Sequence, residues 1–201
     1  ESPKGVMLVG MPGCGKSLAA KATASLFGLP LLKMDMGSLM GKYVGESEGN
    51  MRRAIQVAEA VSPCVLWVDE VEKAFVGTRG QSGGSEVSSR MFGYFLTWMQ
   101  EKTKQVFVVA TANDISALPP ELLRKGRFDE IFYINFPTLS ERAEIFKVHL
   151  QKRKKLSNSL QLNRLAQETD GFSGADIESV VKEAIEMAFV DDEADLTTTL
   201  L

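Results

Sequence analysis

A glycine-rich segment ending in Lys-Ser carries the strongest signal for chemistry in this sequence of 201 residues. Its residues, Gly10-Met11-Pro12-Gly13-Cys14-Gly15-Lys16-Ser17, fit the pattern G-x-x-x-x-G-K-[ST]. Glycines let backbone N–H groups surround a phosphate, because a side chain would block the approach. An apolar run precedes the segment and an Ala-rich run follows it, so we expect a strand before it and a helix after it. The N-terminus of that helix would favour an anion.

This segment predicts a binding site for ATP and Mg²⁺. Lys16 is expected to reach the β- and γ-phosphates, and Ser17 is expected to ligate Mg²⁺. The alternative is a glycine-rich turn that binds no nucleotide, which the Lys-Ser ending and the flanking elements disfavour. The predicted nucleotide contacts are Pro12, Gly13, Cys14, Gly15, Lys16, Ser17 and Leu18.

Two carboxylates, Asp69 and Glu70, follow a second apolar run at residues 64–68. Beside a phosphate loop, an Asp at this place holds the Mg²⁺ shell, and the following Glu orients and activates the attacking water. Most acidic pairs at strand ends are simply solvated. The functional interpretation therefore depends on the phosphate loop, which favours it here.

Polar residues near two later strands allow two interpretations. Asn113 follows a β-branched run at residues 106–110 and could hydrogen-bond the γ-phosphate or the water, but Asn-Asp is also a common loop opener. Arg124 and Arg127 lie three apart near a turn, and a guanidinium can neutralise charge that develops on a transferred phosphoryl group. The residues alone leave Asn113 undecided and favour a surface basic cluster for the two arginines.

Composition and charge restrict the class of protein. Apolar residues make up 44% and charged residues 24% of the chain, which is ordinary for a soluble globular protein. The formal net charge of −3 gives no electrostatic footprint for nucleic acid. Cys14 and Cys64 have no metal-ligand spacing, so we expect two reduced thiols. No apolar stretch is long enough to span a bilayer, and no signal peptide opens the chain.

Strands that alternate with helices predict a parallel sheet with helices on both faces. Strands are expected at residues 5–10, 30–35, 64–68, 106–110 and 131–134. Helices are expected at residues 16–27, 46–61, 86–101, 140–154, 160–168 and 173–190, with a mobile Gly/Ser-rich loop at 77–85. The acidic segment 191–195 and the TTTLL end at 197–201 are expected to form a frayed or truncated terminus. Gly28 should end the first helix, and Ser173 with Asp176 should cap the last.

The domain organisation follows from where the strands stop. Since no strand is expected after Pro137, we place a large ATPase subdomain at 1–137 and a small helical lid at 138–201. The sequence opens at Glu1, almost directly on a strand, so we expect a domain excised from a longer protein.

Taken together, the segments GMPGCGKS, KYVGESE, VLWVDE, TAND, LLRKGRFDE and GFSGADI resemble the AAA family, the narrower group within the AAA+ ring ATPases. Two stretches, CVLWVDE and TANDISALPPELLRKGRFDEIF, look closest to plastid- and cyanobacterial-type AAA ATPases. The resemblance implies an α/β fold, the three-layer αβα sandwich of P-loop NTPases with a C-terminal helical lid. It also implies Mg-dependent ATP hydrolysis in a homo-oligomeric ring, commonly a hexamer, which remodels or unfolds a polypeptide substrate.

The resemblance also assigns roles to single residues. Asn113 would be the γ-phosphate sensor, and Arg124 and Arg127 would be fingers inserted into the site of the neighbouring subunit. Three lid residues would lie near the nucleotide, although composition alone would place the first on a helix surface: His149, Gly174 and Ala175.

The segment that follows Lys42 resembles the loop that lines the ring pore and grips polypeptide. Its members are Tyr43, Val44 and Gly45. An aromatic side chain offers sequence-tolerant apolar contact, and the glycine permits movement. The alternative is a tyrosine that packs in a surface turn.

Some features depart from the family pattern. Lys125 stands where proline is usual between the two arginines, so that turn is expected to be less rigid. Residues 98–101 stand where an Asp-Gly-Phe signalling segment is expected, and the adenine-contacting segment before the phosphate loop is absent or cut off.

Three other functions are weighed against a remodelling ATPase. One is a nucleotide-gated assembly or regulatory module that does not thread its partners. Another is the ATPase half of a membrane metalloprotease, but one histidine and no H-E-x-x-H leave no protease site within the sequence. The acidic balance disfavours a nucleic-acid motor. The expected location is the cytoplasm or a soluble compartment such as the plastid stroma.

Overall fold

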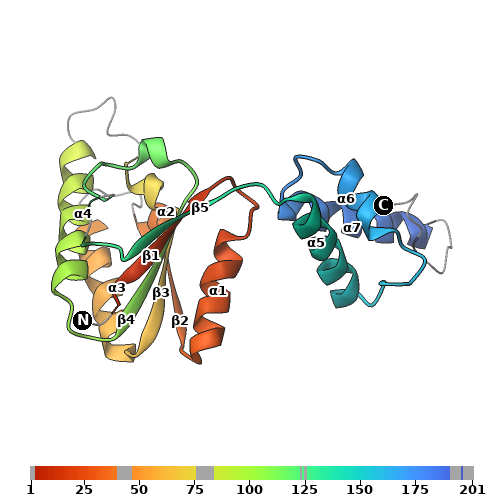
Figure 1. Ribbon diagram of the computed structural model, residues 1–201. Coiled ribbons are helices and arrows are strands. Elements are labelled where there is room, and N and C mark those ends of the chain that lie inside the picture. Colours follow the sequence, from red (N-terminus) through yellow and green to blue (C-terminus); the bar gives the residue numbers. More distant parts are fainter. Residues whose placement is uncertain are drawn as a thin grey trace. The chain divides into compact units, whose positions relative to one another are not determined.

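The computed structural model describes residues 3–39, 47–75, 84–122, 124, 126–190 and 196, and for residues 84–89 it describes the backbone alone. The chain divides into two compact units, which are described separately (Figure 1). The first comprises Glu1–Gly10 and Lys16–Ile134, and the second comprises Met11–Gly15 and Asn135–Leu201.

The first unit contains a five-stranded parallel sheet with the order β2-β3-β4-β1-β5. Its strands are β1 (Gly5–Gly10), β2 (Leu31–Asp35), β3 (Cys64–Asp69), β4 (Val106–Ala112) and β5 (Glu130–Ile134). All five predicted strands are confirmed. Strand β4 extends two residues beyond its predicted end at residue 110, through Thr111 and Ala112.

Helices cover both faces of this sheet, so the predicted αβα sandwich is confirmed. Figure 1 shows α1 (Lys16–Phe27) on one face, and α3 (Ser47–Val61) and α4 (Gly84–Glu101) on the other. Successive side chains of a strand point to opposite faces. Leu8 accordingly packs with Ala20 and Ala24 of α1, while Met7 and Val9 join the larger core with Met51 and Ile55 of α3. Both faces are buried, as parallel sheets require.

The helix boundaries differ from the prediction in small ways. Helix α1 has its predicted bounds, and Gly28 ends it in a left-handed conformation with φ 64°. The predicted mobile loop at 77–85 lies outside the described residues except at its end, where Gly84 already begins α4. Three short elements were not predicted, because a single turn has no periodicity: α2 (Met36–Leu39) and the 3₁₀ turns η1 (Val71–Phe75) and η2 (Ile115–Ala117). None of the described helices is both long and apolar enough to cross a bilayer.

The second unit contains the three helices α5 (Leu139–Lys152), α6 (Leu162–Glu168) and α7 (Gly174–Val190). Thr138 and Glu141 form a capping box at the start of α5, and Ser173 with Asp176 forms the predicted one at α7. The buried side chain of Arg142 joins α5 to α6, because its Nε donates to the Ala166 carbonyl at 2.9 Å.

The three helices enclose a separate apolar core. Its buried members are Phe146, Leu150, Leu160, Leu165, Ile177, Val181, Ala184, Ala188 and Leu196. Leu196 packs into this core and is only 3% exposed, whereas the residues predicted to form a frayed terminus, 191–195 and 197–201, lie outside the described part of the chain.

Replacing Phe146 with alanine tests how far this core stabilises the second unit. Phe146 is fully buried, so Phe146→Ala should lower the free energy of unfolding by about 3–5 kcal/mol through lost burial and a cavity. Val148→Ala is the matched control, because Val148 lies two residues away and is 55% exposed. Urea unfolding followed by circular dichroism measures both. Equal effects of the two substitutions would contradict this core assignment.

Candidate functional site

The carboxyl ends of three neighbouring strands bring the polar residues of the first unit together. Strand β4 lies between β1 and β3, with Leu8 opposite Thr111 and Val68 opposite Ala110. In a parallel sheet all strands end at the same edge, which is where ligands bind in open α/β sheets. The end of β1 at Gly10, the acidic pair after β3 and Asn113 after β4 therefore share one edge.

The hydroxyl of Thr111 connects β4 to the acidic pair. It donates to Asp69 Oδ1 at 2.7 Å and accepts the backbone N–H of Glu70 at 3.3 Å. The indole Nε1 of Trp67 lies 3.5 Å from the same oxygen. Thr111 is buried, so this hydroxyl fixes the end of β3 without help from solvent. Sequence analysis did not single out Thr111, although it lies between the predicted strand at 106–110 and Asn113.

Lys33 on β2 holds the other oxygen of Asp69. Its Nζ lies 2.8 Å from Asp69 Oδ2 and 4.4 Å from the centroid of the Trp67 ring. Burial alone would raise the pKa of Asp69, but hydrogen bonds from Lys33 and Thr111 outweigh it and lower the pKa below its usual value. Asp69 is therefore a carboxylate at neutral pH, which is the form that an ion such as Mg²⁺ needs.

Glu70 has an unusual backbone conformation and a lysine partner. Its φ of 54° lies in the left-handed region, which is uncommon for residues other than glycine and typical of functional sites. The Lys73 N–H donates to the Glu70 carbonyl at 2.9 Å, and Lys73 Nζ forms an ion pair with Glu70 Oε2. The hydrogen bond to Glu70 raises the pKa of Lys73, so the lysine is charged at neutral pH.

A third carboxylate connects η1 to Asn113. Glu72 is 8% exposed, and its Oε1 accepts the backbone N–H of Asn113 at 3.0 Å. Its Oε2 is buried without a hydrogen-bond partner among the described residues. Sequence analysis did not single out Glu72, although its place two residues after Glu70 in the same turn was a usable signal. The structure thus ties Asn113 to the turn that carries the acidic pair.

The start of the phosphate loop and its lysine belong to the first unit. Lys16 is buried although it is charged, and its Nζ donates to the Gly10 carbonyl at 2.6 Å. The Ser17 and Leu18 side chains are exposed. Gly15 has φ 93°, and a Cβ built on it would meet no atom within 4 Å, so open space lies beside its backbone. In the first unit, a buried ammonium directly after β1 fits a phosphate group.

Ser17 and Asp69 offer the oxygen atoms that a Mg²⁺ ion beside a bound nucleotide would need. Among the described residues, no group of three or more His, Cys, Asp and Glu side chains is placed to bind a metal. Mg²⁺ is commonly held by one or two protein oxygens together with substrate phosphates and water. Ser17 and Asp69 supply that number.

In the second unit, the middle of the phosphate loop contacts the start of α7. The Ala175 N–H donates to the Gly13 carbonyl at 3.2 Å. Gly13 has φ 78°, and a Cβ built on it would lie 2.7 Å from Ser173 Oγ and 2.9 Å from Ala175 Cβ, so no larger residue fits there. Gly174 and Ala175 therefore lie against the loop at Gly13. Pro12 is exposed and Cys14 is partly exposed.

His149 belongs to a charged cluster on α5 and α7. Its Nδ1 lies 3.2 Å from an Arg153 nitrogen and 3.9 Å from Glu178 Oε1. Burial lowers the pKa of His149, although Glu178 opposes the shift, so the ring is neutral at neutral pH. Hydrogen bonds from Arg153 and Lys182 lower the pKa of Glu178 to about 2. The described contacts of His149 are thus with charged side chains.

The two arginines are placed differently. Arg124 is exposed, while Arg127 is partly buried and its guanidinium donates to the Glu121 carbonyl of the same chain. Lys125 and the predicted pore residues Tyr43, Val44 and Gly45 lie outside the described residues.

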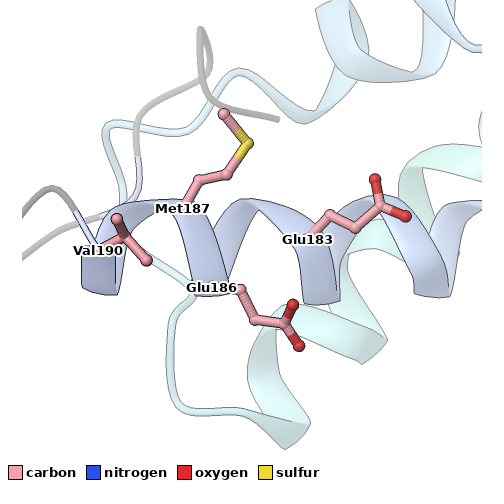
Figure 2. A pocket seen from close by; sticks show the side chains of 4 residues that line it. All are labelled: Glu183, Glu186, Met187 and Val190. Carbon is pink, nitrogen blue, oxygen red and sulfur yellow. The ribbon is translucent and has the colours of Figure 1, made fainter.

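One surface hollow of about 460 Å³ lies elsewhere, on α7. Glu183, Glu186, Met187 and Val190 line it (Figure 2). All four belong to this helix, and none is a predicted site residue. The hollow therefore adds nothing to the candidate site.

Replacing Thr111 with valine tests the hydroxyl bridge. Thr111→Val keeps the shape of the side chain but leaves Glu70 N–H and Asp69 Oδ1 without their partner. The free energy of unfolding should fall by about 1–3 kcal/mol, because buried polar groups are then unsatisfied. Thr111→Ser keeps the hydroxyl and should lose less than half as much. Urea unfolding measures both, and an equal loss in the two variants would show that the methyl group matters rather than the bridge.

Acid titration tests the cluster around Glu178. Its folded-state pKa of about 2 lies below the ordinary value of 4.5, so its stabilising contribution is complete above pH 4.5 and is lost as the pH falls toward 2. Between pH 7 and 2 the free energy of unfolding should therefore fall by about 1 kcal/mol less in Glu178→Gln than in the unmodified protein. The difference is this small because solvent screens a partly exposed ion pair. Glu168→Gln, which alters an exposed pair with Arg164, is the control. Thermal unfolding between pH 2 and 7 measures the pH dependence of stability for both variants. The same pH dependence in both variants and in the unmodified protein would refute the stabilising role of Glu178.

Comparisons with known proteins were made against family models and curated sequences. The model of the ATPase family associated with various cellular activities (AAA) matches residues 6–136, and that of the AAA+ lid domain matches residues 159–199. The chain is 51% identical over 200 residues to the "Uncharacterized AAA domain-containing protein ycf46" of Guillardia theta, covering 99% of this chain and 39% of that protein. It is 52% identical to the protein of the same name from Pyropia yezoensis, covering 95% and 39%.

A more distant relative carries a different name. The "Cell division cycle protein 48 homolog" of Archaeoglobus fulgidus is 40% identical over 186 residues, which is 92% of this chain and 25% of that protein. The chain thus spans well under half the length of these curated relatives. The ycf46 matches agree with the expected placement near plastid-type AAA ATPases. Because the AAA model covers more than half of the sequence and a lid model follows it, the chain belongs to the AAA family and has the P-loop NTPase fold with a helical lid.

Proposed function

We propose that this chain is the Mg-dependent ATP-hydrolysing domain of a ring-forming AAA ATPase that remodels or unfolds polypeptides. The observation that carries the ATPase part is the shared edge of the sheet. There a buried Lys16 follows β1, and Asp69 and Glu70 follow β3, where Thr111 bonds the Asp69 carboxylate and the Glu70 backbone N–H. Membership of the AAA family supports the same activity.

The residues of one chain then have distinct roles. ATP supplies the phosphoryl group that is transferred to water, and Mg²⁺ neutralises phosphate charge. Lys16 binds the β- and γ-phosphates with the loop residues Pro12–Leu18, and Ser17 with Asp69 holds the ion. Glu70 accepts a hydrogen bond from the attacking water and orients it. Asn113, held through its backbone by Glu72, is the γ-phosphate sensor.

The lid residues complete the proposed nucleotide site. Gly174 and Ala175 contact the nucleotide through their backbone, and His149 lies near the nucleoside. We keep the subdomain boundary near Pro137, with residues 1–137 binding the phosphates and 138–201 forming the lid.

The ring part of the proposal rests on the arginines. Arg124 is exposed and so is available to a neighbouring subunit. Arg127 acts as the second finger once its guanidinium leaves the Glu121 carbonyl of its own chain. In a ring, commonly a hexamer, both would enter the site of the next subunit. Tyr43, Val44 and Gly45 would grip the polypeptide at the pore. The proposed compartment is the cytoplasm or one like the plastid stroma, which the similarity to plastid-type AAA ATPases supports.

ATP turnover measured against protein concentration tests this function. Turnover per chain should rise steeply with concentration, because each site needs an arginine from a neighbour. Glu70→Gln should abolish turnover while ATP still binds. Arg127→Ala should lower turnover by a factor on the order of 10³–10⁵. Arg164→Ala, in an exposed ion pair with Glu168, should change turnover less than twofold and is the matched control.

A different outcome of these turnover measurements would support a different function. Turnover that does not depend on concentration or on Arg127 would show a self-contained nucleotide switch, and the ring would have to be abandoned. Concentration-dependent turnover without processing of any unfolded polypeptide would leave the ATPase intact. It would favour a nucleotide-gated assembly module over a remodelling machine.

A further inference from the structure

We infer that Lys73 is a positioning residue that orients the carboxylate of Glu70 and connects it mechanically to the short helix α2. The inference rests on the proposed ATPase function, since Glu70 is there the residue that orients water. Lys73 matches none of the residues to which the sequence assigned a role. It is singled out by its contacts alone.

Three contacts converge on the turn that carries Glu70. The Glu70 N–H donates to Thr111, the Lys73 N–H donates to the Glu70 carbonyl, and Lys73 Nζ pairs with Glu70 Oε2. The first two fix a backbone whose φ of 54° is costly for a residue with a side chain. The third fixes the side chain. Because the ammonium occupies Oε2, the other oxygen of the carboxylate remains to accept a hydrogen bond from water.

The stem of Lys73 lies against α2. A Cβ built on Gly37 would be 3.1 Å from Lys73 Cδ and 3.8 Å from Lys73 Nζ. The side chain of Lys73 therefore passes α2 at Gly37, the position of this helix that has no side chain. Gly37 has an ordinary backbone conformation for an L-residue, so its missing side chain, rather than its φ, is what the lysine uses.

The charges around Lys73 support a position between Glu70 and α2. Asp35 and Glu72 also attract its ammonium, beside the direct partner Glu70. Asp35 in turn accepts the Ser38 N–H at 3.2 Å, which ties its carboxylate to α2. A displacement of α2 would thus move the lysine stem and, through the ion pair, the Glu70 carboxylate. A neutral side chain at position 73 would lose this connection.

The first test is a kinetic comparison in the full chain. Lys73→Met keeps an unbranched apolar side chain and removes the charge, so kcat for ATP should fall about fivefold, as expected for the loss of a partly exposed ion pair. KM and the affinity for a fluorescent ATP analogue with Mg²⁺ should stay within twofold, because the phosphate contacts are unaltered. Lys73→Arg should recover at least half of kcat. Lys147→Met, which removes another lysine paired with a glutamate three residues away, is the matched control.

The second test is a double-mutant cycle with Gly37. Gly37→Ala places a methyl group against the lysine stem and should lower kcat about twofold while leaving both charges in place. In a Lys73→Ala background the stem is absent, and the same substitution should have no further effect. Gly49→Ala is the control, because a Cβ built on Gly49 meets nothing within 4 Å.

Hydrogen–deuterium exchange of the nucleotide-free protein gives a readout that needs no turnover. Lys73→Met should accelerate exchange in Met36–Leu39, and Lys147→Met should not. Unchanged kcat in Lys73→Met, a change confined to KM, additive effects of the two substitutions or unaltered exchange in α2 would each overturn the inference. Failure of the unmodified protein to hydrolyse ATP would instead contradict the proposed function. The two failures are thereby distinguishable.

Discussion

One hydroxyl group, that of Thr111, sets the geometry of the candidate site in the first unit. It stands on β4 and satisfies both the carboxylate of Asp69 and the backbone N–H of Glu70 at the end of β3. The bridge forms only because the parallel register places Val68 opposite Ala110, so that the two strands end together. A slip of one residue would turn the hydroxyl to the other face of the sheet. The acidic pair therefore depends on the pairing of β3 with β4 as much as on its own residues.

Two lysines complete the electrostatics of this edge. Lys33 and Lys73 each pair with one member of the acidic pair, so both carboxylates are compensated without a bound cation. Such partly exposed pairs contribute little to stability. Each lysine instead fixes the orientation of a carboxylate, because it binds one of its two oxygens and thereby sets where the other oxygen lies. Glu72 adds a third carboxylate, which is buried and accepts the backbone N–H of Asn113, and so it links the end of β4 to the same turn.

The phosphate loop shows how glycine is used for two different reasons. Gly15 adopts a left-handed conformation beside open space, where a ligand has access to the backbone. Gly13 is also left-handed, but it has no room for a side chain because Ser173 and Ala175 occupy the space. The backbone hydrogen bond from Ala175 to Gly13 makes α7 part of the surroundings of the loop. The start of α7 and the loop are thus connected by a backbone hydrogen bond, and a Cβ built on Gly174 would lie 3.2 Å from the Gly13 carbonyl oxygen, so this contact leaves little room for a side chain there.

The sequence by itself predicted the elements, because burial of one or both faces imposes an apolar pattern along each single segment. Apolar runs and helical spacing predicted all five strands and six of the helices. The fixed spacing of the phosphate loop predicted Lys16 and Ser17 as site residues. The tertiary structure alone decided the partners. Thr111 meets Asp69 and Glu70 across 42 and 41 residues, and Lys33, Lys73 and Glu72 acquire their roles only when strand register and a 3₁₀ turn bring them to the same edge. The contact of Gly13 with Ala175 and the burial of Leu196 likewise depend on packing between distant segments. Such contacts leave no periodic trace in the sequence, because each depends on where two separate segments end.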